Sequence, residues 1–247
     1  MKPLFAMILS GFLLATSGPG HAAVAGKDVR EAWLRASIVL DANGKLTSLE
    51  WIDAKPNDRL VTTPLEAVVQ DWEFEPGMLD GIPAVTETGL LLHVKLKKTN
   101  EGGIALEIDD ARTGAISQSQ APPKYPIDQA KRGAQARVVM RIETDEAGNF
   151  ASASVMEYVG SSGASTSRKD FESAALKAVK TWNYRTGRVG SVGLRATLRV
   201  PISFCMDNWC ERKQPEDTNA ESPSGVAVAT DSVARIKTRT SRVEIQG

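Results

Sequence analysis

Histidine and cysteine, the side chains that most metal and nucleophilic sites require, are scarce in this sequence of 247 residues. It holds two histidines, His21 and His93, and two cysteines. A tetrahedral zinc site takes three or four such ligands, and a nucleophilic triad needs an imidazole beside its serine or cysteine. Catalysis by carboxylates alone stays open, but no pattern of Asp and Glu argues for it. The sequence therefore predicts no enzyme activity, no metal and no cofactor.

The N-terminal residues 1–25 have the features of a secretory signal peptide. Lys2 precedes an apolar run over residues 4–15, and small residues permit cleavage after Ala22 or Ala25. The run is shorter than the about 20 apolar residues that a membrane-spanning helix needs. An uncleaved short anchor is the alternative. We therefore expect an exported protein.

Export determines how the two cysteines are interpreted. Cys205 and Cys210 have four residues between them, whereas the redox-active Cys-x-x-Cys motif has two. In an oxidising compartment, such a pair is expected to join as a structural disulfide. The bond would lock the end of a strand.

Composition and charge are those of an ordinary globular protein. The chain is 42% apolar and 24% charged, and its 30 basic side chains equal its 30 acidic ones. A dedicated nucleic-acid-binding protein usually carries a basic surplus. The sequence therefore predicts no nucleic-acid partner, and its length fits one domain or two small ones.

The second half of the sequence predicts two strands, a helix and a last strand. Residues 136–144 and 150–159 alternate between apolar and polar positions on either side of an Asp-Glu-Ala-Gly turn, which is the pattern of a β-hairpin. From Ser167 to Trp182, apolar residues recur every three or four positions, as on one face of a helix. Residues 194–204 form a final β-prone run. The order is ββαβ.

The first half repeats this order with different residues. A hairpin is expected around Asn43-Gly44, and a helix begins at the capping box that starts with Thr63. In each half a tryptophan, Trp72 or Trp182, ends the helix, with an aromatic residue two places later and a glycine five places later. We interpret this spacing as a tandem duplication. The predicted fold class is α+β: two tandem small ββαβ modules, each an antiparallel sheet with a helix packed on one face.

Five segments are expected along the chain. A polar stretch with glycines separates the modules, and the sequence after Cys210 turns polar and loses its aromatic residues, which is typical of disorder. The segments are a signal peptide over 1–25, a divergent first module over 26–98, a linker over 99–121, a second module over 122–210 and a polar, disordered tail over 211–247. The linker could add one short strand. The basic end of the tail is either an attachment site or simply solvated.

Several motifs occur together in the second module. They are a Tyr-Pro entrance, a short helical stretch that ends at a glycine, the hairpin turn, the apolar helix face and the aromatic run that follows it. The residues concerned are Tyr125, Pro126, Gly133, Gly148, Phe171, Ala174, Ala175, Leu176, Val179, Trp182, Tyr184, Gly187 and the strand 200–204. Together they resemble the C-terminal domain of TonB-type energy transducers. The first module is similar to the same family over its hairpin, its helix and its Trp-Glu-Phe-Glu-Pro-Gly segment.

The resemblance implies a small periplasmic domain that carries out no chemistry. In the family, this domain engages the TonB box of outer-membrane receptors by strand addition, for which an open strand edge supplies the backbone groups. Carried over to this sequence, the partner-binding residues are Lys124, Tyr125 and Pro126 at the entrance, and Arg195, Ala196, Thr197, Leu198 and Arg199 on the last strand. Tyr125 either packs against the core or presents its ring outward.

Charge and alternatives complete the sequence-based expectation. Basic residues outnumber acidic ones in the second module but not in the first, which favours acidic peptide partners for the second. One alternative is a membrane-anchored energy transducer with an uncleaved short N-terminal helix. Another is an envelope protein, structural or enzymatic, that reuses the fold. A homo-oligomer is left open.

Overall fold

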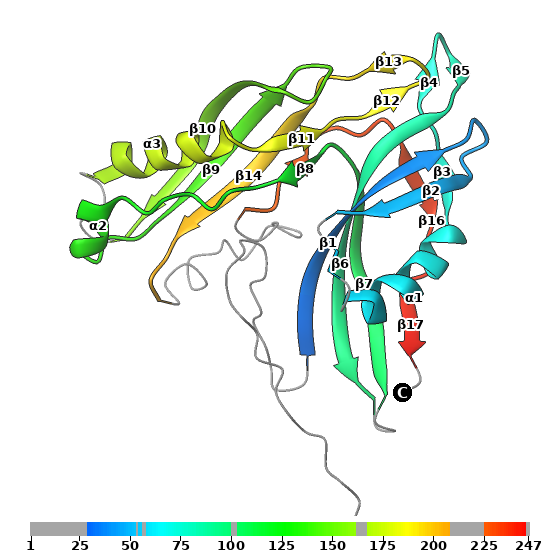
Figure 1. Ribbon diagram of the computed structural model, residues 1–247, viewed down its shortest axis with the longest axis horizontal. Coiled ribbons are helices and arrows are strands. Elements are labelled where there is room, and N and C mark those ends of the chain that lie inside the picture. The colour runs from blue at the N-terminus through cyan, green and yellow to red at the C-terminus, as the bar shows by residue number, and fades with distance from the viewer. Residues whose placement is uncertain are drawn as a thin grey trace, which may run out of the picture.

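The computed structural model describes residues 29–52, 54–55, 58–99, 103–161, 167–207 and 225–245. These residues form an α+β fold in which the two largest sheets, both antiparallel, lie side by side, each built mainly from one half of the chain (Figure 1). The predicted signal peptide, and the anchor that is its alternative, lie outside the described residues. Among the described residues, no helix is long and apolar enough to cross a membrane.

The first half contains a β-hairpin, a helix and a long return strand. Its elements are β1 (Val29–Leu40), β2 (Leu46–Trp51), α1 (Arg59–Gln70), β3 (Glu73–Glu75), β4 (Met78–Leu79), β5 (Ile82–Pro83), β6 (Thr86–Lys98), β7 (Ile104–Gly114) and β8 (Ile116–Ser119). β1 pairs with β2 on one side and with β6 on the other, and β7 pairs with the second edge of β6. The spatial order is therefore β2-β1-β6-β7.

The second half follows the same order of elements after a short entrance helix. Its elements are α2 (Ile127–Lys131), β9 (Ala136–Thr144), β10 (Phe150–Gly160), α3 (Arg168–Val179), β11 (Asn183–Arg185), β12 (Arg188–Val189), β13 (Val192–Gly193) and β14 (Thr197–Phe204). β9 pairs with β10 and with β14, both antiparallel. The α+β class and the antiparallel pairing agree with the sequence-based expectation, whereas the interpretation as tandem copies stays a prediction.

The two hairpin turns have the same hydrogen bonds. The carboxylate of Asp41 accepts hydrogen bonds from two backbone N–H groups within its own turn, and the carboxylate of Asp145 does the same in the other. Gly44 and Gly148 have φ of +81° and +83°, a conformation that side chains with a Cβ disfavour. A Cβ at Gly148 would also overlap the carbonyl oxygen of Tyr184. Each turn therefore needs glycine for its conformation and for close packing.

Each half has an apolar core between its sheet and its helix. In the second half, Phe171, Ala175 and Val179 of α3 are fully buried against β9 and β14. Trp72 and Trp182 are each 3% exposed and lie in the cores of the first and second halves. The tryptophans therefore pack in the interior, as their position on apolar helix faces predicts.

The C-terminal residues 225–245 contain three strands, so the prediction of a disordered tail is wrong for this part. They are β15 (Val228–Ala229), β16 (Arg235–Thr238) and β17 (Arg242–Ile245). β15 pairs with β14, β16 with β3 and β17 with β7. The segment has too few apolar residues for a core of its own, but the strand edges of both halves can satisfy its backbone groups. Residues 211–224 of the expected tail lie outside the described residues.

Short strands that cross between the halves interlock them. β8, which follows β7, pairs with β11 of the second half, and β16, which follows β15, pairs with β3 of the first half. β12 adds a third connection by pairing with β6. The expected linker 99–121 therefore contains two strands: β7 belongs to the sheet of the first half, and β8 forms a separate two-stranded sheet with β11.

Candidate functional site

The last strand of the second half, β14, is the predicted partner-binding element. Its alternate residues Leu198, Val200, Ile202 and Phe204 are at most 2% exposed and form one side of the core. Because successive side chains of a strand point to opposite faces, Arg199 lies on the other face of the sheet. There its guanidinium is 3.1 Å from a carboxylate oxygen of Glu157 on β10.

The outer edge of β14 is covered by the C-terminal segment. In the register of the pair, Leu198 lies opposite Ala229 and Arg199 opposite Val228. The backbone N–H of Thr230 donates to the carbonyl of Thr197 at 2.9 Å, and that of Gly225 donates to the carbonyl of Pro201 at 2.6 Å. The expectation of an open edge is therefore wrong for residues 197–201, because the chain itself supplies the pairing strand. Partner binding at these residues stays a prediction.

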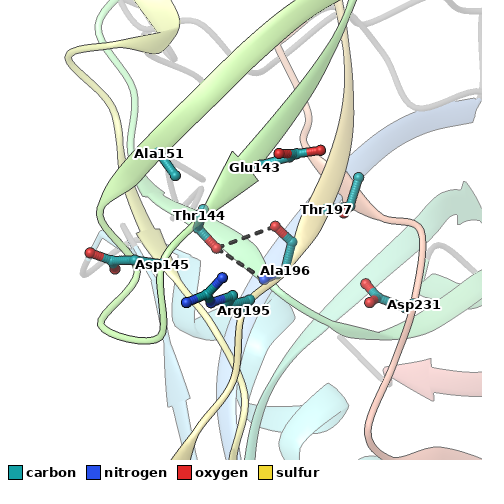
Figure 2. A pocket seen from close by; sticks show the side chains of 8 residues that line it. All are labelled: Glu143, Thr144, Asp145, Ala151, Arg195, Ala196, Thr197 and Asp231. Carbon is teal, nitrogen blue, oxygen red and sulfur yellow. Dashed lines mark hydrogen bonds between the residues drawn. The ribbon is translucent and has the colours of Figure 1, made fainter.

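A hollow opens where β14 begins and the C-terminal segment departs (Figure 2). Its lining comes from β9 and the following turn, from β10, from the start of β14 and from the C-terminal segment: Glu143, Thr144, Asp145, Ala151, Arg195, Ala196, Thr197 and Asp231. Thr144 holds Ala196 in place, since its Oγ1 accepts from the Ala196 N–H at 3.1 Å. Arg195 is exposed and lies 3.4 Å from the Glu146 carboxylate. Arg195 and Ala196 precede the covered stretch of β14.

The charges in this hollow are suited to binding polar and charged groups. Hydrogen bonds from Asn149, first from its side chain, hold the pKa of Asp145 below its usual value, so this carboxylate is ionised at neutral pH. The lining offers neither an imidazole nor a thiol. In the part of the chain that the structure describes, no three His, Cys, Asp or Glu side chains are placed to hold a metal ion. The arrangement can hydrogen-bond to a polypeptide and can attract charged side chains.

The entrance residue Tyr125 packs against the core. Its hydroxyl donates to the carbonyl of Ala134 at 2.6 Å, and its ring meets those of Phe171 and Phe204 edge-on at 5.9 and 5.7 Å. Burial raises the pKa of this hydroxyl, so it stays protonated and able to donate. Of the two orientations left open by the sequence, the structure has the inward one.

The predicted site residues do not form one cluster. Tyr125 contacts Phe204 at the end of β14, whereas Arg195 precedes its start. A strand of this length spans about 25 Å. Lys124 is exposed and Pro126 half-buried beside Tyr125, and Arg195 is exposed at the other end. A partner that contacts both groups would therefore have to lie along the whole strand.

The predicted disulfide is described for only one of its cysteines. Cys205 directly follows β14, and no described cysteine is a free thiol. Cys210 lies outside the described residues, so the pairing stays a prediction.

The sequence reasoning missed the C-terminal segment as part of the site. The apolar run from Val226 to Ala229 is a local signal, but a run of this length cannot be assigned to a strand by its period. Ala227 is fully buried in the core of the second half, whereas Ala234, a few residues later, is buried in the core of the first. Only a three-dimensional fold can assign one short segment to two cores.

The geometry defines a class of α+β protein: a hairpin and a return strand form a sheet, a helix covers one face, and the return strand carries the candidate site. Residues 121–206 match the family model described as the Gram-negative bacterial TonB protein C-terminal. Two curated proteins named Protein TonB, from two strains of Xanthomonas campestris pv. campestris, are each 28% identical to this chain over 91 residues.

The matched region covers only part of each protein. The 91 residues are 37% of this chain and 38% of each relative, so the chain spans well under half the length of the curated relatives that it matches. The family match begins after β8 and includes β9 to β14, but it excludes the first half and the C-terminal strands. No solved structure matches the chain.

Proposed function

We propose that this chain is a non-catalytic, TonB-like protein of the cell envelope that binds partner polypeptides by strand addition along β14. The observation that carries the proposal is the match of residues 121–206 to the TonB C-terminal family, because these residues contain β14 and the two strands on its inner side, β9 and β10. The expected partners are periplasmic segments of outer-membrane receptors, such as the TonB box, in TonB-dependent transport. Lys124 to Pro126 and Arg195 to Arg199 are the proposed contacts.

Strand addition suits the chemistry of this edge. The carbonyl groups of Thr197 and Pro201 already accept hydrogen bonds from a strand that is not part of the hairpin, so the edge can pair with an extended segment. Main-chain pairing supplies affinity, and side-chain pockets supply specificity. The hollow at Arg195 and Ala196 extends this edge beyond the covered stretch.

We also propose that the chain is exported, that its signal peptide is cleaved, and that Cys205 pairs with Cys210 in the periplasm. The two halves would be tandem copies of one ancestral module. The shared interactions support this: Trp72 and Trp182 each donate a backbone hydrogen bond to a valine carbonyl three residues back, at 3.1 and 3.3 Å. In this interpretation the first copy has lost the Tyr-Pro entrance and serves the second as a scaffold.

Cross-linking in living cells tests the proposed partner. A photoactivatable residue replaces Arg195, whose side chain is 78% exposed beside the hollow, and cross-linked proteins are identified by mass spectrometry. We expect outer-membrane receptors joined through their periplasmic segments. The matched control replaces Lys177, an exposed residue of α3, and should give no receptor. Equal recovery from both positions, or none from Arg195, contradicts the proposal.

A further inference from the structure

We propose that the outer edge of β14 is an exchangeable acceptor of extended peptides, and that the chain's own residues 225–230 are its resident occupant. A partner would enter by displacing this segment. The inference rests on the proposed function for the identity of the natural partner, but not for the exchange itself. Residues 225–230 would therefore act as an internal competitor of partner peptides for the outer edge of β14.

The two halves differ in how their equivalent edges are covered. In the first half, residues Gly89 to Lys98 of β6 pair with β7. β7 has eleven residues and is the next strand in the chain after β6. In the second half, the edge of β14 pairs with β15, which has two residues in register. A continuous hairpin strand closes its edge permanently, whereas a short strand held by a few hydrogen bonds can be replaced by a longer one.

Pro201 weakens the hold of any resident strand on this edge. Its carbonyl accepts from Gly225 on the outer side, and the N–H and C=O of one residue in an antiparallel strand point to the same side. Proline has no N–H, so the outer edge lacks a donor at this position. Proline inside a sheet is found on strands whose donor side is not fully paired.

The occupant that fits this edge is an extended segment with small side chains at alternate positions. Ala227 is fully buried, and Ala229 packs against the same core. A Cβ added at Gly114 would lie 2.7 Å from the Cβ of Ala229, so Ala229 lies close against β7 at a position where β7 has no side chain. The partner is therefore expected to carry Ala, Gly or Ser at two positions separated by one residue.

The rest of the segment keeps the competitor in place. Ala234 is buried in the first core, β16 pairs with β3 and β17 pairs with β7. These contacts hold residues 225–230 near β14 even when they are displaced, so the segment rebinds as an intramolecular ligand at high effective concentration. Release of the edge therefore needs no release of the whole C-terminal segment.

The test compares the wild-type chain and three variants of it by hydrogen exchange and by NMR titration. Thr230→Pro removes the N–H that binds Thr197, and Ala227→Asp places a charge in the core; either should release residues 225–230. Arg239→Pro, between β16 and β17, is the matched control. The probe is a synthetic peptide with the sequence of residues 225–232, added to the labelled chain.

In the two releasing variants, we expect amide exchange of residues 197–202 to quicken at least about tenfold, and the peptide to bind at least about tenfold more tightly than to the wild type, because the internal competitor is gone. Circular dichroism verifies that each variant is folded. Unchanged protection in both releasing variants overturns the proposal, and so does equal peptide binding by the wild type. An exposed edge that takes up no peptide also overturns it.

The outcome separates this proposal from the proposed function. If the variants bind the 225–232 peptide but no receptor segment is cross-linked at Arg195, the exchange stands and the receptor assignment fails. If receptors are cross-linked but the variants behave as the wild type does, the receptor assignment stands and the internal competitor fails.

Discussion

At the scale of single residues, the main charged cluster lies on the first sheet. The carboxylate of Asp109 on β7 accepts from Lys95 Nζ at 3.0 Å and lies 3.1 Å from His93 Nδ1. The other ring nitrogen of His93 is 3.4 Å from Glu31, and its ring stacks on Trp33 at 4.7 Å between centroids. Three neighbouring strands, β1, β6 and β7, are thus joined by charge as well as by backbone pairing.

This cluster predicts an acid-sensitive contribution to stability. The hydrogen bond from Lys95 holds the pKa of Asp109 below its usual value, so the stabilisation is present above the unfolded pKa of about 3.9 and is lost as the pH falls through the lowered folded value. We expect Asp109→Asn to lower the free energy of unfolding at pH 7 by roughly 0.5–1 kcal/mol, since the carboxylate is partly exposed.

Urea denaturation at pH 7 and at pH 2.5 measures this effect. The difference between Asp109→Asn and the wild type should shrink at the lower pH, because protonation of the wild-type carboxylate removes its charge interaction with Lys95. Glu66→Gln on the exposed side of α1 is the control. A difference that persists unchanged at low pH would show that the variant acts through packing.

At the scale of elements, each hairpin turn is packed against the strand that follows the helix. Gly44 lies against the carbonyl of Phe74 in β3, and Gly148 against that of Tyr184 in β11. Tyr184 is itself fixed, since its hydroxyl donates to the carbonyl of Val179 at 3.0 Å. In the second half, the turn, the helix end and the short strand are therefore held together by Tyr184.

Comparing an alanine substitution at Gly148 with one at Gly133 should separate the cost of a positive φ from the cost of overlap between the added Cβ and β11. We expect Gly148→Ala to lower the free energy of unfolding by about 2–4 kcal/mol, because it combines a disfavoured positive φ with overpacking. Gly133→Ala is the matched control: it has φ of +65° with nothing within 4 Å of an added Cβ, so it should cost only about 1–2 kcal/mol. Equal losses in urea denaturation would mean that the turn does not press on β11.

At the scale of the whole molecule, the two halves share buried contacts and are not independent units. Arg185 of β11, in the second half, donates to the hydroxyl of Ser37 in β1, in the first half, at 2.6 Å. Between the halves, a Cβ at Gly77 would lie 2.5 Å from Val189 Cγ2. Changes on one side of this contact should therefore depend on the other side.

A double-mutant cycle tests that dependence. Gly77→Ala should cost about 1–3 kcal/mol through overpacking against Val189. Combined with Val189→Ala, which removes the opposing methyl groups, the loss should be smaller than the sum of the two single losses by at least about 0.5 kcal/mol. Thermal or urea unfolding of the four proteins gives the coupling. Strict additivity would show that the halves do not touch at this point.

Local sequence was enough to predict a hairpin, a helix and a return strand in each half. The alternation in 136–144, the Asp and Gly of each turn and the apolar face up to Trp182 are read within a few residues of one another, because strand and helix periods are short-range. The same patterns predicted a last strand over residues 194–204, and the resemblance to the TonB C-terminal domain made this strand the candidate for partner binding. They also placed Tyr125 beside the core as one of two orientations, which only its contacts with Phe171 and Phe204 could decide.

Only the tertiary structure determined which strands the C-terminal segment pairs with. β15 has two residues and β16 four, too few to show a period, and their position depends on edges that β14 and β3 present after the rest has folded. A backbone donor or acceptor that would otherwise be buried without a partner takes whichever partner lies within reach. That requirement acts through space and not along the sequence, which is why the chain's own end covers the strand that the sequence alone would leave open.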